Sequence, residues 1–147
     1  MIQDVIFAPV RGGFFYDDQA AIRQGREQDG VAYLGEPVTQ GFTKVRQPAT
    51  ALSVGLVLED GAVVWGDMVS VQYSGAAGRD PVFIPQRIEA IARERVVPRL
   101  IGRDAADAAR NCEDVFAFGE EGRLPLAIEY GVSQALLRAA ARAHACT

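Results

Sequence analysis

The fold of this chain is decided by the stretch Leu52-Ser53-Val54-Gly55-Leu56-Val57-Leu58, which is followed closely by Asp60-Gly61. Its large apolar residues stand at the even positions, so they share one face of a predicted β-strand. Asp-Gly is a strong hairpin turn, because glycine accepts the positive φ that such a turn requires. The chain then returns over Ala62–Met68 as the second strand of the hairpin, which is the third predicted strand of the chain, with Val63 and Trp65 on one face. The stretch therefore predicts a β-hairpin.

A long segment precedes the hairpin. The short apolar run Val5–Pro9 predicts a first strand, and Val10–Thr50 then separates it from the hairpin. Loops beyond about 15 residues are uncommon and are often functional lids. We expect this loop to hold a short helix after Asp18 and an extended piece near Phe42–Val45. Its aromatic cluster Phe14–Tyr16 either pins the loop to the domain or lines a site, and the sequence leaves both open.

The second half of the chain has a helical apolar period. The predicted helices run over Pro85–Val97, from Asp104 to an end at Gly119, and from Pro125 to about Ala145. We expect Pro98 to end the first helix and Gly119 to end the second in a left-handed conformation. Gly131 lowers helix stability by about 1 kcal/mol relative to alanine, so we expect a neighbouring element to approach closely there. The expected buried faces are Ile84, Ile88 and Ile91, then Ala105, Ala108, Cys112 and Phe116, then Ile128, Val132, Ala135, Leu136, Ala139 and Ala143.

The order of strand, long segment, hairpin and helices defines the fold class. It predicts an α+β domain, in which a three-stranded antiparallel meander is followed by a three-helix bundle packed on one side. A length of 147 residues fits one domain and leaves little room for a second. We therefore treat 1–147 as a single domain.

Composition excludes several classes of function. The net charge is −4 and no block of basic residues occurs, which argues against nucleic-acid binding. No apolar run approaches the ~20 residues of a membrane span, and the N-terminus lacks the features of a signal peptide. The two cysteines are too few for a zinc cluster or a disulfide scaffold. We expect a cytoplasmic protein. With one histidine, His144, and one lysine, Lys44, the supply of catalytic bases is thin.

A polar, glycine-rich segment, Val71–Pro81, leaves the predicted third strand. Its Gln72 offers donors and acceptors that suit a carboxylate or an amine, although most such segments only connect a strand to a helix. This segment resembles the corresponding one of methylaspartate ammonia-lyases, which are members of the enolase superfamily. Three further stretches are similar to that family in the same order: Gly13–Ile22, Gly41–Gln47 and Arg123–Ala135.

The resemblance implies an N-terminal α+β cap that works with a C-terminal barrel. Enzymes of this family eliminate ammonia from 3-methylaspartate to give mesaconate. The resemblance also implies a Mg2+ ion held by acidic barrel residues, which stabilises the charge that builds up on the substrate carboxylate, and a barrel lysine as base. We expect these groups on a separate or missing chain, and neither catalytic nor metal-binding residues in this one. The expected partners are that barrel chain and the substrate, in an oligomer.

The resemblance also implies which residues line the substrate pocket. Gln72 should lie on the amine side of the substrate. Weaker candidates for closing the pocket and excluding water are Phe14, Phe15, Tyr16, Tyr73 and Ser74. We expect Asp17 and Asp18 to cap and hydrogen-bond the loop rather than to hold a metal. His144 should be a partly exposed residue at a helix end, and Lys44 matches no base of the family.

Two other interpretations stay open. The chain can be a truncated piece of an ordinary single-chain enzyme, which the sequence does not distinguish from a natural subunit. It can also be a stand-alone binding or interaction module that kept the cap and lost the chemistry. Such a module would bind a ligand or self-associate without any partner.

Overall fold

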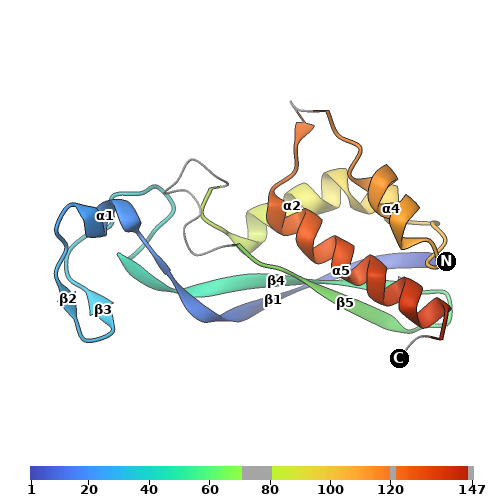
Figure 1. Ribbon diagram of the computed structural model, residues 1–147, viewed down its shortest axis with the longest axis horizontal. Helices are drawn as coiled ribbons and strands as arrows, with labels where there is room; N and C mark the ends of the chain where they lie inside the picture. The colour runs from blue at the N-terminus through green and yellow to red at the C-terminus, as the bar shows by residue number, and fades with distance from the viewer. Residues whose placement is uncertain (71–80, 120–121, 146–147) are drawn as a thin grey trace.

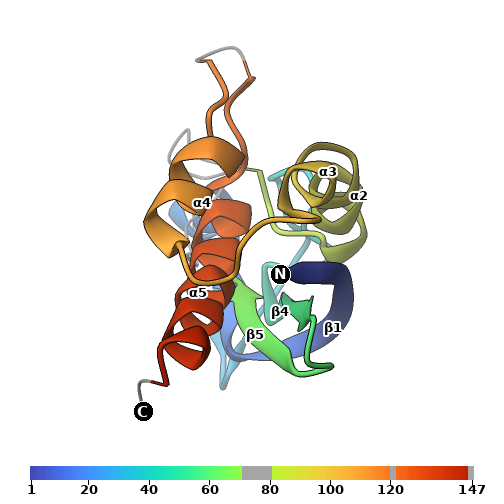
Figure 2. The ribbon, with the colours of Figure 1, turned by 90° about the vertical axis from the view of Figure 1, so that its right-hand side faces the viewer.

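The computed structural model describes residues 1–70, 81–119 and 122–145. A sheet of three antiparallel strands runs along the molecule, and the larger helices lie on one of its faces (Figures 1 and 2). The strands are β1 (Ile2–Asp17), β4 (Arg46–Leu58) and β5 (Val63–Met68), in the spatial order β1-β4-β5. This arrangement confirms the predicted α+β class and the antiparallel meander.

The predicted hairpin joins β4 to β5. Leu52 pairs with Met68 and Val57 with Val63, and Gly61 has the positive φ of +79° that the turn requires. The large residues at the even positions of β4 are buried beneath the helices, as their alternation predicts. The hairpin therefore forms the centre of the domain.

The first strand is much longer than the predicted Val5–Pro9. β1 pairs with β4 along the length of both strands, with a register shift between Arg11 and Phe15. The predicted loop Val10–Thr50 was therefore wrong at both ends, and the aromatic cluster Phe14–Tyr16 lies in a strand. The irregular pairing around two glycines explains the error, because it removes the alternation of period two from the sequence.

The segment between β1 and β4 forms a small lobe at one end of the sheet (Figure 1). It contains the expected short helix after Asp18, α1 (Gln19–Arg23), and a small hairpin of β2 (Gln28–Asp29) and β3 (Ala32–Tyr33) that was not predicted. Phe42–Val45 does not form the expected extended piece, since β4 begins at Arg46.

The first predicted helix is divided in two. α2 (Pro85–Arg95) ends before Val96, and Pro98 lies in the first turn of α3 (Val97–Leu100) instead of ending a helix. Proline is tolerated there because the first turn leaves its N–H groups unpaired within the helix. Ile84, which was expected to face inward, is exposed. It is the extended residue before α2 and so lies outside the helical period.

The second helix, α4 (Ala108–Val115), is shorter than expected. Asp107 caps it by accepting a hydrogen bond from the Arg110 N–H at 3.1 Å, whereas Asp104 caps only a preceding turn. Its buried residues are Asn111 and Val115, while the predicted Ala108, Cys112 and Phe116 are half-buried against the core. Gly119 does not adopt a left-handed conformation, because the helix has already ended at Val115.

The last helix, α5 (Leu126–Ala143), packs directly on β5. A Cβ atom at Gly131 would lie 2.6 Å from Met68 Cγ, and one at Gly66 would lie 2.0 Å from the Gly131 carbonyl oxygen. The close approach predicted at Gly131 is therefore confirmed. The predicted inner face is buried except for Ala143, which is exposed in the last turn of the helix.

Candidate functional site

The predicted pocket residues are only partly within the described structure. Gln72, Tyr73 and Ser74 lie outside the described residues. Phe15 and Tyr16 are neighbours near the end of β1, where β1 pairs with the start of β4. The structure therefore shows the surroundings of three of the six candidates, Phe14, Phe15 and Tyr16, which are consecutive in β1.

Tyr16 connects β1 to β4 and to Ser70, which follows β5. Its side chain is 3% exposed, and its hydroxyl donates a hydrogen bond to the Thr50 carbonyl oxygen at 2.7 Å. A backbone hydrogen bond from Ser70, the last described residue after β5, reaches the same hydroxyl. Burial raises the pKa of the Tyr16 phenol to about 12. At neutral pH the phenol is therefore protonated and acts as a hydrogen-bonding group rather than a base.

Phe15 and Phe14 lie at the surface around Tyr16. The Phe14 ring meets the Tyr16 ring edge-on, with centroids 5.6 Å apart and an interplanar angle of 84°. Phe15 is exposed, and the Arg46 guanidinium lies 5.8 Å from its ring centroid. The same guanidinium lies 5.0 Å from the ring of Tyr33 in β3. Arg46 thus connects the small lobe to the aromatic cluster.

The two acidic residues after the cluster are engaged within the chain. Asp17 accepts two hydrogen bonds of 2.6 Å from the Arg46 guanidinium. Asp18 is fully buried, and its carboxylate accepts hydrogen bonds from the backbone N–H groups of Ala21, Val38 and Thr39 and from the Thr39 hydroxyl. The predicted role in capping and hydrogen-bonding the loop is therefore confirmed for Asp18, whereas Asp17 ends β1 and pairs with the first residue of β4 instead.

The pKa of the Asp18 carboxyl reflects two opposing effects. Burial alone would raise this pKa, because it disfavours the charged form. The hydrogen bonds from Thr39, Val38 and Ala21 together outweigh burial and hold the pKa below the usual range of an aspartate. Asp18 is therefore a charged anchor at neutral pH, and it ties α1 to the chain that follows β3.

The described residues do not fit a Mg2+ site. Within ranges 1–70, 81–119 and 122–145, no group of three or more His, Cys, Asp or Glu residues could hold a metal ion. Of the two consecutive carboxylates Asp17 and Asp18, the first is engaged by Arg46 and the second by the lobe. His144 follows α5 and is exposed, with its ring Nε2 3.2 Å from the Ala106 carbonyl oxygen, as expected of a helix-end residue.

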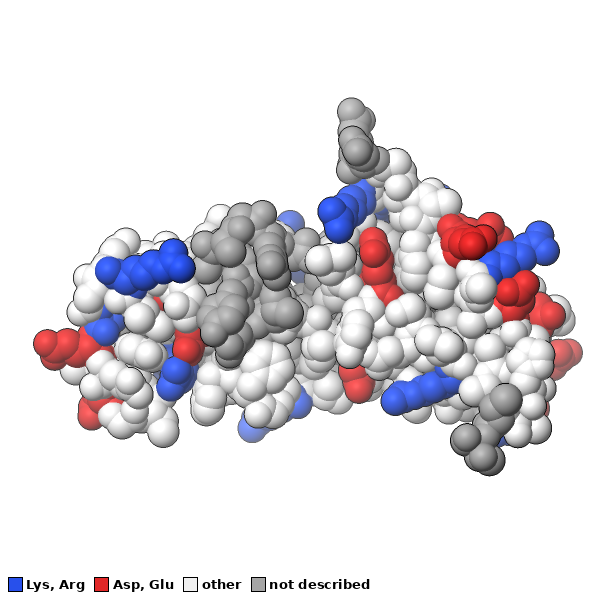
Figure 3. Space-filling view, in the orientation of Figure 1, with Lys and Arg blue, Asp and Glu red and all other residues white. Residues whose placement is uncertain are grey.

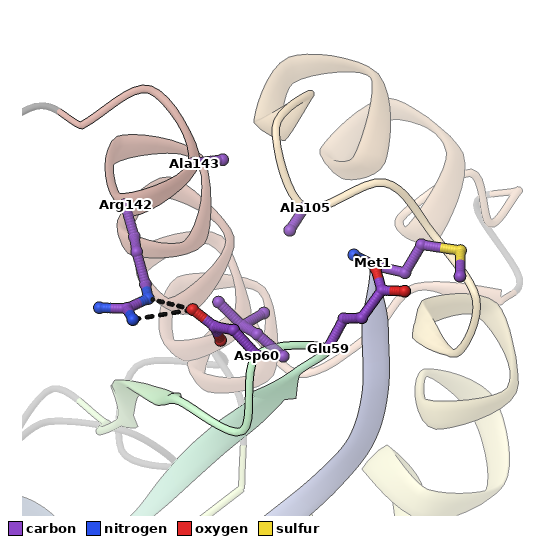
Figure 4. A pocket seen from close by; sticks show the side chains of 7 residues that line it. Met1, Glu59, Asp60, Ala105, Arg142 and Ala143 are labelled. Atoms are coloured by element: carbon purple, nitrogen blue, oxygen red, sulfur yellow. Dashed lines mark hydrogen bonds and ion pairs between the residues drawn. The ribbon is translucent and has the colours of Figure 1, made fainter.

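Hollows in the described part of the chain are candidates for a ligand site. An open pocket of about 570 Å³ lies beside the N-terminus and the turn that joins β4 to β5 (Figure 4). Its charged groups pair with one another, the Met1 amine with Glu59 at 3.3 Å and Arg142 with Asp60 at 2.8 Å. A substrate pocket instead needs polar groups that converge on the ligand. The open pocket is therefore a poor candidate.

The second hollow is a small apolar cavity of about 40 Å³ beside the residues that flank the segment 71–80. Its lining includes Ser70, Pro81, Val82 and Phe83. Small-molecule sites usually enclose roughly 300–1,000 Å³, so this cavity alone does not hold a substrate. The described part of the chain can supply one wall of a site.

The surface has a mixed charge. On the face in Figure 3, basic and acidic side chains are interspersed, and acidic ones gather toward the end that carries α4.

Among the described helices, none is both long and apolar enough to cross a membrane.

The fold places the chain in a class of known domains. A member of the enolase superfamily from Agrobacterium tumefaciens has the same fold over 98% of this chain and 36% of its own, with a TM-score of 0.56 at 17% identity. The chain thus has the fold of an enolase-superfamily N-terminal cap. A sequence profile described as "Methylaspartate ammonia-lyase N-terminus" matches residues 1–147. The chain therefore belongs to the methylaspartate ammonia-lyase family. It corresponds to the N-terminal part of the members of that family.

Individual relatives agree with this assignment. The methylaspartate ammonia-lyase of Clostridium tetanomorphum is 44% identical over 147 residues, which cover 99% of this chain and 36% of that protein. Its Mg complex superposes with a TM-score of 0.93. The Citrobacter amalonaticus enzyme, solved with (2S,3S)-3-methylaspartic acid, gives a TM-score of 0.90 at 42% identity, covering 99% of this chain and 36% of that one. The chain thus spans about a third of the length of these relatives.

Sequence reasoning identified the family but missed some residues that support the site. Sequence reasoning did not single out three residues that hydrogen-bond the candidates. Arg46 bonds Asp17, Thr50 bonds Tyr16, and Thr39 bonds Asp18. The opposite charges of Asp17 and Arg46 were a usable signal. Their pairing becomes apparent only when β1 is extended to Asp17 and placed in register with β4.

Proposed function

We propose that this chain is the N-terminal cap of a methylaspartate ammonia-lyase that eliminates ammonia from 3-methylaspartate to give mesaconate and catalyses the reverse addition. The observation that carries the proposal is the family match over residues 1–147. Two features of relatives support it, namely the Mg complex of the Clostridium enzyme and the (2S,3S)-3-methylaspartic acid in the Citrobacter enzyme.

The chemistry is assigned to the rest of the enzyme. In this proposal a barrel, on a separate chain or on a further part of the same protein, holds the Mg2+ ion and supplies the base. The engagement of Asp17 by Arg46 and of Asp18 by the lobe supports this division. The protonated state of the Tyr16 phenol at neutral pH supports it as well.

The contribution of this chain is a wall of the substrate pocket. Gln72 contacts the amine side of the substrate, and Tyr73 and Ser74 continue the wall, while Phe15 and Tyr16 help to exclude water. The hydrogen bond between Ser70 and the Tyr16 hydroxyl supports this grouping, because Ser70 precedes Gln72 by two residues. Excluding water strengthens the electrostatic interactions in a site.

The proposal is tested by reconstitution. The purified chain is mixed with the barrel part of a methylaspartate ammonia-lyase, and the double bond of mesaconate is followed by its ultraviolet absorption. We expect turnover from the mixture and none from either part alone. A folded and verified mixture that stays inactive would contradict the proposal.

Two further measurements separate the alternatives. In the active mixture, Gln72→Ala should change the relative turnover of different amines in the reverse reaction more than it changes stability. Equal turnover of all amines by the variant and the parent would argue against the role of Gln72.

Calorimetric titration of the chain alone with methylaspartate should show no heat of binding, whereas a stand-alone binding module would bind.

A further inference from the structure

The dipeptide Asp-Gly occurs twice in the chain, as Asp29-Gly30 and as Asp60-Gly61. Both copies stand where two antiparallel strands are joined, the first between β2 and β3 and the second between β4 and β5. Both glycines have a positive φ, of +58° and +79°. The same dipeptide is therefore placed in the same kind of turn twice, and the two copies differ in their surroundings.

An aspartate that precedes a glycine can react with its own backbone. The glycine nitrogen attacks the aspartate Cγ, a Cγ–N bond closes a five-membered succinimide ring, and the nitrogen proton leaves with the carboxyl hydroxyl as water. Water then opens the ring. Attack at Cγ restores aspartate, whereas attack at the backbone carbonyl carbon leaves the main chain running through the side chain, as isoaspartate. Glycine favours ring closure because it has no Cβ to obstruct it, and water is the one co-reactant.

The second Asp-Gly pair is restrained against this reaction. The Gly61 N–H donates a hydrogen bond of 2.9 Å to the Leu58 carbonyl oxygen, which engages the nitrogen that would attack. The Asp60 carboxylate accepts hydrogen bonds from the Ala62 N–H at 3.0 Å and from the Arg142 guanidinium at 2.8 Å and 3.1 Å (Figure 4). The hydrogen bond from Arg142 holds the pKa of the Asp60 carboxyl below its usual range. The neutral acid that the reaction consumes is therefore scarcer.

The first pair lacks these restraints. Asp29 and Gly30 are exposed. Among the residues that the structure describes, none accepts a hydrogen bond from the Gly30 N–H and none donates one to the Asp29 carboxylate. The hairpin that they close has two residue pairs, Gln28 with Tyr33 and Asp29 with Ala32, and so short a hairpin is marginally stable. Local opening therefore lets the Gly30 nitrogen reach the Asp29 carboxyl.

We propose that Asp29-Gly30 is a site of spontaneous isomerisation to isoaspartate, and that the turn and Arg142 protect Asp60-Gly61 from the same reaction. The position of the site at an exposed turn of the lobe agrees with the general concentration of chemical change at such tips. The proposal concerns the chain itself and is independent of the reaction that the assembled enzyme catalyses.

Isoaspartate would disturb the lobe, because it inserts one additional carbon atom into the main chain of the turn. The register of β2 and β3 sets the contacts of Arg46 with the lobe. Its guanidinium donates a 3.3 Å hydrogen bond to the Val31 carbonyl oxygen and lies 5.0 Å from the Tyr33 ring centroid. Both contacts depend on a hairpin of two pairs, so the modified chain should lose them.

Incubation in heavy water tests the proposal. The purified chain is kept at neutral pH in water enriched in 18O and is then digested with trypsin in ordinary water, which gives peptides 27–44 with Asp29 and 47–79 with Asp60. Chromatography separates the isoaspartyl from the aspartyl form of each peptide, and heavy oxygen marks the product of ring opening. We expect isoaspartate to form at Asp29 at least about fivefold faster than at Asp60, because the β2–β3 turn opens more readily.

The unfolded chain and two variants provide the controls. In denaturant, where the restraints are absent, both sites should react at similar rates. Asp29→Glu keeps the charge but cannot close the five-membered ring, so it should remove the product from peptide 27–44. Arg142→Ala should raise isomerisation at Asp60 at least about twofold and leave Asp29 unchanged, since Arg142 is an exposed ion-pair partner of Asp60 alone. Circular dichroism verifies that both variants are folded.

The result that would overturn the proposal is equal isomerisation at Asp29 and Asp60 in the folded chain. Formation of isoaspartate at Asp29 in the unfolded chain but not in the folded one would overturn it as well. An unchanged rate at Asp60 in Arg142→Ala would refute the protection assigned to Arg142.

Discussion

Removal of the Asp18 carboxylate should loosen the lobe between β1 and β4. The two oxygens accept four hydrogen bonds, of 3.3 Å from the Ala21 N–H, 2.7 Å from the Val38 N–H, and 2.9 Å and 2.6 Å from the N–H and hydroxyl of Thr39. The bond to Ala21 caps α1, and the others hold the chain that follows β3. One side chain therefore connects two segments about twenty residues apart in sequence.

The expected loss of stability follows from these contacts. Replacing a helix N-cap by alanine costs about 1 kcal/mol. The two backbone donors of Val38 and Thr39 are part-buried and would lose a charged acceptor, at about 1 kcal/mol each. We therefore expect Asp18→Ala to lower the free energy of unfolding of the lobe by about 3 kcal/mol. Asp18→Asn should cost less, about 2 kcal/mol, because it keeps one acceptor oxygen but turns an NH2 group toward backbone donors.

The stability that the Asp18 carboxylate contributes should depend on pH. The folded-state pKa of Asp18 lies below the ordinary pKa of an aspartate, which the unfolded chain has. The unfolded chain therefore binds more protons in the range between these two pKa values. The stability from Asp18 is therefore present at pH values above the ordinary pKa of an aspartate and is lost as the pH falls through the lower folded-state pKa. The difference between the parent and Asp18→Asn should shrink over the same range.

Amide hydrogen exchange and denaturant unfolding at pH 7 measure the effect, and exchange at Val38 and Thr39 reports on the lobe itself. Asp29→Ala, at an exposed aspartate in β2 of the same lobe, is the control and should change little. The reasoning is refuted if Asp18→Ala and Asp29→Ala have the same stability and the same exchange rates at these two amides.

Three other predictions concern the packing and the network around the sheet. Gly131→Ala should lower the free energy of unfolding by about 2 kcal/mol, because its Cβ would lie 2.7 Å from a backbone nitrogen of β5; unchanged denaturant midpoints would contradict this. Tyr16→Phe should cost about 1 kcal/mol by leaving the Thr50 carbonyl without its donor, and ultraviolet titration of the parent should show one phenol with a pKa of about 12. Because this folded-state pKa is raised, the stability from Tyr16 should be lost as the pH rises from about 10 to 12. Asp60→Ala removes an exposed ion pair with Arg142, and because solvent screens such pairs, the thermal unfolding midpoint should stay close to that of the parent. A clear fall in the midpoint would show that the pair is more than a surface contact.

The sequence correctly predicted the elements in which apolar residues repeat with an unbroken period. The alternation in β4 and the Asp60-Gly61 turn identified the hairpin, and the apolar stripe of α5 with Gly131 identified the helix that packs on it. Local chemistry decides these elements, so no knowledge of distant partners was needed. The short helix after Asp18 was predicted for the same reason.

The errors arose where distant pairing decides the structure. The extension of β1 to Asp17 depends on the register with β4, and the shift after Arg11 hides the alternation. The buried face of α4 was misplaced because Asn111 is buried through a hydrogen bond to the Asp104 carbonyl oxygen, which composition does not reveal. The pairing of Asp17 with Arg46 also depends on the register between β1 and β4 and so could not be predicted without it.

The most direct test of the central claim is the turnover of 3-methylaspartate by this chain alone. The purified chain, free of other proteins, is incubated with 3-methylaspartate and Mg2+, and mesaconate is measured by chromatography. The proposed division of labour predicts no mesaconate until the barrel part is added, and steady formation afterwards. Mesaconate produced by the chain alone, and lost when the chain is unfolded, would contradict the account.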